Sequence, residues 1–368
     1  MNAERLNAIA AFLLESEKTN NIQKQFENLN NHLGQLVSQP SNSDFQSRVA
    51  AAIKSLDKTL NAFYVPLTGS YKDAITDILG LRFYSPSVIA EIEDSIKRNV
   101  MTPAVVQQDL SKLLTDRNEF LASLKALRTN LKKVGVETEE LSVGETELSV
   151  LIPRALFKND LEGLSSELKN ITFIIRSFSE AANISPEPIE VREISTTDPT
   201  FFLGVDVSTL VLLSLAVKWC LDSILAGLKI RELAATAKTT GIDESIVEQI
   251  TKSLEAKTNR QIEDKVKEIM KDYAGDEGTK HEVEQKMQRS ITFLYARIER
   301  GMIMQPRGLP PPKTDNETEE KARQRKEIEE LNAIASTLEF PAIPGEPTVK
   351  LTSAPPAASD GKTRSDGG

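Results

Sequence analysis

Apolar residues recur at helical spacing through the first third of the chain. The clearest stripe advances in steps of four and three residues and consists of Ile22, Phe26, Leu29, Leu33 and Leu36. This spacing places the side chains on one helix face and is typical of a bundle helix or a coiled-coil seam. Similar stripes precede and follow it, and residues 1–135 are therefore predicted to form a helical bundle.

The pattern changes from helical to alternating beyond residue 136. Three short runs rich in β-branched and aliphatic residues are predicted strands: Glu147–Ile152, Pro188–Ile194 and Thr200–Val205. An amphipathic helix with Leu164, Ile171 and Phe178 separates the first two runs. Strand, helix, strand predicts a right-handed crossover with two parallel strands, and a short turn should return the third strand antiparallel.

Residues 136–240 are therefore predicted to form a small β-α-β-β-α sandwich with a roughly ferredoxin-like composition. It should hold the only sheet of the protein, with three strands. Residues 207–237 should form its second helix and cover the same sheet face as the first.

The most apolar segment is Val205–Ile230. Its longest run without a charge, Val207–Val217, is eleven residues, whereas a helix that spans a bilayer needs about 20. Lys218 and Asp222 stand four apart and could pair on one helix face. We interpret the segment as a buried core helix with Trp219 or Cys220 in the core; the alternative is a membrane helix.

The last third of the chain divides into a hairpin and a tail. Residues 241–304 carry two apolar stripes around a Gly- and Asp-rich turn, which predicts a helical hairpin. Residues 305–368 are predicted to be a Pro-rich linker, a charged helix over Asn316–Leu338 and a disordered tail, because the end is rich in Pro, Gly and Ser. The predicted fold class is mainly α with a small α+β module.

The composition offers few parts for catalysis. The 368 residues include two histidines, His32 and His281, and one cysteine, Cys220. Neither histidine has a second histidine or a cysteine nearby in the sequence, which argues against a zinc site or a Ser-His-Asp triad. Cys220 lies in an apolar helix, where we expect a buried, inert thiol. No phosphate-binding loop is present, and we predict no catalytic, cofactor-binding or metal-binding residues.

Charge and cysteine content indicate a compartment and disfavour one class of partner. The formal net charge is −9, which disfavours a broad basic surface for nucleic acid. A single cysteine suits a reducing cytosol. The acidic N-terminus lacks the basic region of a signal peptide. We expect a cytoplasmic protein that does not bind nucleic acid.

One loop could hold a small polar site. Ser195, Thr196, Thr197 and Asp198 place three hydroxyls and a carboxylate at a predicted sheet edge, where they could bind a ligand or a partner. The same residues readily bond to their own backbone in a turn, and we favour that interpretation.

Three function classes remain. Long amphipathic helices without catalytic parts favour a non-catalytic cytosolic scaffold or regulatory adaptor, which acts through protein–protein contacts and self-association. A homo-oligomer, a dimer in particular, is expected because the N-terminal stripes are hard to bury within one chain. The alternatives are a membrane-acting protein that uses residues 205–230 and an enzyme with a carboxylate-based site in the α/β module.

Overall fold

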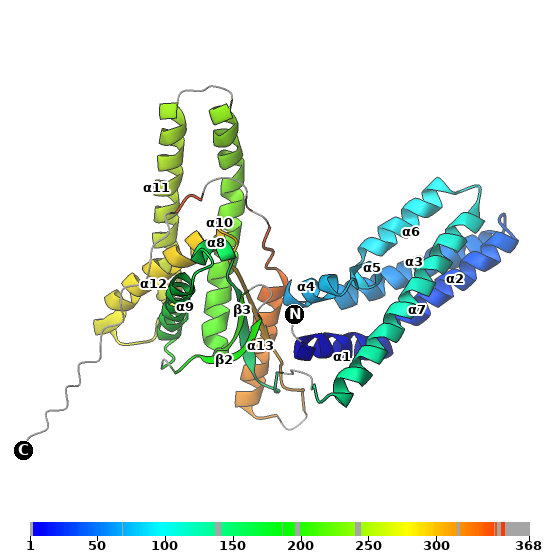
Figure 1. The fold of residues 1–368 in the computed structure, drawn as a ribbon, viewed down its shortest axis with the longest axis horizontal. Coiled ribbons are helices and arrows are strands. Elements are labelled where there is room, and N and C mark those ends of the chain that lie inside the picture. The colour runs from blue at the N-terminus through cyan, green and yellow to red at the C-terminus, as the bar shows by residue number, and fades with distance from the viewer. Residues whose placement is uncertain are drawn as a thin grey trace, which may run out of the picture. The chain divides into compact units, whose positions relative to one another are not determined.

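The computed structural model describes residues 3–67, 69–136, 141–185, 187–195, 199–239, 244–314, 317–341, 343 and 347–349. The described structure is mostly helical (71%) and has a small antiparallel sheet of four strands. Figure 1 shows the helices of the two ends of the chain and the strands between them. The prediction of a mainly helical chain with one small sheet is confirmed. By contact, the chain divides into two compact units: unit 1 holds Met1–Ser149 and Gln305–Glu339, and unit 2 holds Val150–Met304 and Phe340–Gly368.

The helices of the N-terminal part of unit 1 follow one another closely. They are α1 (Ala3–Asn20), α2 (Ile22–Ser38), α3 (Ser43–Tyr64), α4 (Gly69–Asp77), α5 (Leu81–Tyr84), α6 (Ser87–Arg98) and α7 (Pro103–Lys133). Asn42 caps α3 by accepting from the backbone N–H of Asp44. Pro103 stands in the first turn of α7, where its missing N–H costs nothing. The prediction that this part of the chain is helical is confirmed.

The predicted N-terminal stripes are buried within unit 1 itself. Ile22, Phe26, Leu29 and Leu33 of α2 belong to one apolar cluster with residues of α1, α3 and α7, and α2 packs against both α3 and α7. The stripes therefore find partners inside the chain. That removes the observation from which a dimer was expected, and self-association stays a prediction.

A charged residue lies in the centre of this bundle. Arg117 of α7 is fully buried, pairs with Glu17 of α1 and donates to Gln23 Oε1 at 2.7 Å. Its guanidinium also lies over the rings of Phe26 and Tyr84, 5.3 and 5.2 Å from their centroids. Because a buried charge is tolerated only when it is paired, these contacts fix the register of α7 against α1 and α2.

The sheet has four strands, not the three predicted. They are β1 (Thr146–Leu151), β2 (Glu190–Ser195), β3 (Thr200–Gly204) and β4 (Ile303–Gly308), and the division between the units falls within β1 and β4. β4 lies in the segment predicted as the end of the hairpin and the start of a linker, and it contains Pro306. A proline is tolerated on an edge strand, and β4 is an edge strand because the order is β2-β3-β1-β4.

The strand order also corrects the predicted neighbours. β3 returns antiparallel to β2, as predicted, with Ser195 opposite Thr200 and a register shift between Val191 and Glu193. β3 lies between β1 and β2, which run in the same direction but do not pair. With α9 and the helices between β3 and β4, the elements follow the split β-α-β order of ferredoxin-like sheets.

The helices of unit 2 are α8 (Arg154–Phe157), α9 (Leu161–Ala181), α10 (Val207–Thr239), α11 (Glu244–Ile269) and α12 (Glu277–Ile298), with a 3-10 turn over Met270–Asp272. α9 packs against α10 and α12, and α11 packs against α12 as the predicted hairpin requires. The buried Arg297 of α12 holds both carboxylate oxygens of Glu167 on α9, at 2.6 and 3.0 Å.

The apolar helix α10 is a core helix on one side. Leu213 and Cys220 are buried, as predicted, whereas Trp219 is half-buried and contacts the Tyr295 ring at 6.3 Å between centroids. Over Val207–Leu228 the helix is also long and apolar enough to cross a membrane, and half of that stretch is buried within the protein. Length and composition alone do not separate these two interpretations.

The C-terminal part of the chain contains one more helix and one short segment that is hydrogen-bonded within unit 2. The predicted charged helix is confirmed as α13 (Glu319–Ser336), with Ile328 and Leu331 buried. In unit 2, the Val349 N–H donates to Glu299 Oε2 and its carbonyl accepts from Arg300, both at 3.0 Å. Residues 350–368 of the predicted tail lie outside the described residues.

Candidate functional site

The loop predicted as a candidate site is described only at its two ends. Ser195 ends β2 and pairs with Thr200 of β3, and the Pro199 carbonyl accepts from the Ile152 N–H at 2.9 Å. Thr196, Thr197 and Asp198 lie outside the described residues. The segment joins two antiparallel strands, as the turn interpretation requires, and its role as a binding loop stays a prediction.

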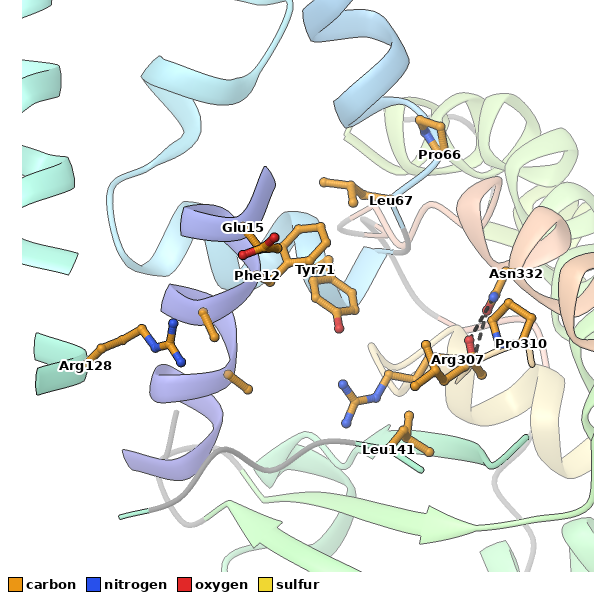
Figure 2. A pocket seen from close by; sticks show the side chains of 14 residues that line it. Phe12, Glu15, Pro66, Leu67, Tyr71, Arg128, Leu141, Arg307, Pro310 and Asn332 are labelled. Carbon is orange, nitrogen blue, oxygen red and sulfur yellow. Dashed lines mark hydrogen bonds between the residues drawn. The ribbon is translucent and has the colours of Figure 1, made fainter. Parts of the chain in front are cut away.

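A larger candidate is a cavity of about 600 Å³ in unit 1, which we call the unit 1 cleft. Ligand pockets of proteins have volumes of about 300–1,000 Å³. Its lining comes from α1, from the start of α4 and the segment before it, from α7, from the segment before β1, and from β4 with the residues after it and α13. Figure 2 shows these residues: Ala8, Ala11, Phe12, Glu15, Pro66, Leu67, Tyr71, Arg128, Leu141, Arg307, Gly308, Leu309, Pro310 and Asn332.

One face of α1 forms the first wall. Ala8, Ala11, Phe12 and Glu15 are spaced at three, one and three residues, so they share a helix face that differs from the core face with Ile9 and Leu13. The two alanines leave the space that a larger side chain would fill. α1 therefore buries one stripe in the bundle and presents a second stripe to the cleft.

Aromatic rings lie beside this wall. The Phe12 ring is 4.9 Å from the Tyr71 ring and 5.8 Å from the Phe63 ring, measured between centroids. Such tilted and offset pairs are favourable ring geometries. Phe12, Phe63 and Tyr71 all belong to or pack on the bundle core, which holds the aromatic wall in place, and Figure 2 shows the Tyr71 hydroxyl directed toward the cavity.

The opposite wall is built where α13 packs on β4. Gly308 donates its N–H to Asn332 Oδ1 at 3.0 Å and accepts from Asn332 Nδ2 at 2.9 Å. A β-carbon at Gly308 would stand 2.7 Å from Ile328 Cγ2 and 2.9 Å from Thr146 Cγ2. Glycine is therefore required for this close packing, and it places Leu309 and Pro310 at the rim.

The charges in the cleft are largely neutralised. Arg307 Nε donates to the buried Glu147 at 2.8 Å, and Glu15 is bound by Lys18 at 2.6 Å. Arg128 of α7 is exposed and makes no ion pair or hydrogen bond within the part of the chain that the structure describes. Among the lining residues, Arg128 is thus the charge that a ligand could meet without competition.

These groups suit binding better than acid–base chemistry. The lining contains neither histidine nor cysteine, and its one carboxylate is already bound to a lysine. General acid–base catalysis needs a group that can exchange a proton with the substrate. The described residues also hold no group of three or more potential metal ligands of the His, Cys, Asp or Glu type.

A second, smaller cavity of about 300 Å³ lies in unit 2 between the end of α9 and the start of α12. Lys286 lines it and lies 2.9 Å from Glu180 and 3.0 Å from Glu282. Burial lowers the pKa of Lys286, but hydrogen bonds to the two carboxylates outweigh it and raise the pKa above its ordinary value. The amine stays charged and both carboxylates are engaged, so this cavity lends no support to a carboxylate-based reaction.

The single cysteine and the two histidines were singled out in the sequence, and the structure describes the surroundings of all three. Cys220 is fully buried, and burial raises the pKa of its thiol, as an inert core thiol requires. His281 is exposed and contacts Gln285 at 2.9 Å, and the His32 ring lies 3.4 Å from the Gln35 side chain. Neither histidine lines one of the two cavities.

The residues of the unit 1 cleft were missed from the sequence. Residues 305–312 read as a linker because Pro306 argues against a central strand. The short apolar run Met302, Ile303 and Met304 after Gly301 is the signal that could have identified a strand. Nothing in the sequence pairs Asn332 with Gly308 or brings Tyr71 to Arg307.

Comparison of the chain with models of known protein families, with curated proteins and with solved structures gives no match.

Proposed function

We propose that this protein is a non-catalytic cytosolic adaptor that acts through protein–protein contacts, and that a partner docks in the unit 1 cleft. The observation that carries the proposal is the cleft's lining. Its walls are aromatic and aliphatic, Glu15 and Arg307 are bound within the chain, and rigid elements position them. Apolar clefts with a few oriented polar groups are characteristic of binding sites.

Site-specific photo-crosslinking in the cell of origin tests this proposal. A photoreactive amino acid replaces Leu309, which lines the cleft and is 42% exposed. The matched control places it at Leu161, which is 81% exposed at the start of α9 and outside both cavities. We expect one discrete crosslinked protein at Leu309 and none at Leu161.

Non-specific hydrophobic association would give more crosslinking at Leu161 than at Leu309, because Leu161 is the more exposed of the two. Equal or stronger crosslinking at Leu161, or no crosslinked protein at Leu309, contradicts the adaptor proposal.

A membrane-acting protein is the second candidate. The observation that favours it is α10, whose stretch Val207–Leu228 has the length and hydropathy of a membrane-spanning helix. Leu215, Leu225 and Ile230 are exposed apolar side chains on this helix. Flotation of the full-length protein with liposomes decides between the candidates, because an adaptor of the cytosol stays at the bottom of the gradient.

A further inference from the structure

The charge of the cleft is positive once the internal ion pairs are counted. Glu147 binds Arg307 and Lys18 binds Glu15. Arg128 keeps its guanidinium without a hydrogen bond or ion pair in the described part of the chain. A guanidinium offers five N–H donors in a planar fork that fits a carboxylate.

The apolar part of the cleft is shaped for a ring or a branched aliphatic group. Ala8 and Ala11 of α1 leave the space open, and the rings of Phe12 and Tyr71 form the adjoining wall. An apolar group that enters is removed from water, and an aromatic group can also pack against the two rings.

The cleft does not offer a strand edge at Gly308. The N–H and carbonyl of Gly308 on the edge strand β4 are both bound by the Asn332 amide. A partner segment therefore cannot extend the sheet at this position and is held by its side chains.

We propose, on the basis of the adaptor function, that the docking segment of the partner is a peptide with an aromatic or aliphatic anchor next to an acidic residue. The anchor fills the space between α1 and the Tyr71 ring. The carboxylate of the acidic residue binds Arg128. This contact makes the cleft prefer a peptide with an acidic side chain over one with an amide side chain at that position.

Competition binding with the full-length protein tests this inference. The reporter is anilinonaphthalene sulfonate, whose fluorescence rises in apolar sites. The competitors are two blocked pentapeptides of sequence Gly-Asp-Trp-Leu-Gly and Gly-Asn-Trp-Leu-Gly, which differ only in the acidic residue. The acidic peptide should displace the reporter at about threefold to fivefold lower concentration, the range of a partly exposed ion pair.

The variants assign the preference to one residue. Arg128→Gln should abolish the preference for the acidic peptide. Lys125→Gln removes an exposed charge from the same helix and should retain the full preference. Equal potency of the two peptides on the wild-type protein, or a preference retained in Arg128→Gln, overturns the inference.

A variant with a blocked cleft distinguishes failure of this inference from failure of the adaptor proposal. Ala11→Trp fills the cleft and should prevent displacement by both peptides, whereas Ala51→Trp on the exposed face of α3 should not. If a folded Ala11→Trp protein binds both peptides normally, the cleft is not the docking site and the proposed function fails as well. Thermal unfolding checks that each variant folds. If Ala11→Trp does not fold, the Arg128→Gln variant still tests the inference.

Discussion

At the scale of single residues, this protein keeps its interior charges in pairs. Glu167 with Arg297 and Glu147 with Arg307 join segments 130 and 160 residues apart in the sequence. A buried pair of this kind contributes little net stability, but removal of one partner leaves an unpaired charge. These pairs therefore mainly specify which elements pack together, and they add little to the free energy of unfolding.

Gly308 is the residue whose replacement we expect to be most informative. Gly308→Ala forces its β-carbon against Ile328 and Thr146 and should lower the free energy of unfolding by about 1–3 kcal/mol, as overpacking does. Gly227→Ala on α10 is the control, because a β-carbon there meets nothing within 4 Å. It should stabilise by about 0.5–1 kcal/mol, since alanine favours a helix. Denaturant unfolding measures both, and a neutral Gly308→Ala would show that α13 does not pack closely on β4.

At the scale of elements, α10 has one face in the core and one outside. Leu213 is 1% exposed and Leu215 is 38% exposed on the same helix, so one face is buried in the core although both faces carry apolar residues. The mean hydropathy of a segment cannot distinguish this arrangement from a membrane helix, because it ignores which face each residue occupies.

Two substitutions on α10 distinguish a core helix from a membrane helix. Leu213→Lys should lower the free energy of unfolding by several kcal/mol, because it buries an unpaired charge. Leu215→Lys should change it by about 0.5 kcal/mol or less, as exposed substitutions do. Thermal and denaturant unfolding measure the difference. If Leu213→Lys leaves stability unchanged and abolishes liposome binding, the membrane-acting alternative replaces the adaptor.

At the scale of the whole molecule, each unit is assembled from segments far apart in the sequence. Unit 1 combines the N-terminal helices with β4 and α13, and unit 2 continues beyond residue 340. Because the first two helices bury their stripes inside unit 1, they are core elements rather than free interfaces.

Truncation tests this assignment. A protein without residues 1–38 loses the buried Ile22, Phe26 and Leu29 and should aggregate or lose its cooperative unfolding transition, because large apolar surfaces become exposed. A protein without residues 350–368 should keep the oligomeric state and thermal stability of the full chain. Light scattering and calorimetry measure both. A dimeric full chain that becomes a folded monomer without residues 1–38 would instead place a dimer interface in the N-terminal helices.

The sequence by itself determined the elements that depend on local periodicity. The stripe of α2, the amphipathic face of α9 and the helix α13 were predictable, because a helix buries residues three and four apart whatever lies opposite. The burial of Cys220 followed from its apolar neighbours along one helix.

Only the tertiary structure decided which faces meet. The pattern in the chain records that a face is buried but not its partner, so the place of β3 between β1 and β2 and the strand β4 with Pro306 were not predictable. The unit 1 cleft needs Phe12, Tyr71, Arg128 and Leu309 brought together from four distant segments. Its charge depends on pairings such as Arg307 with Glu147, because long-range packing determines which charges remain free to bind a partner.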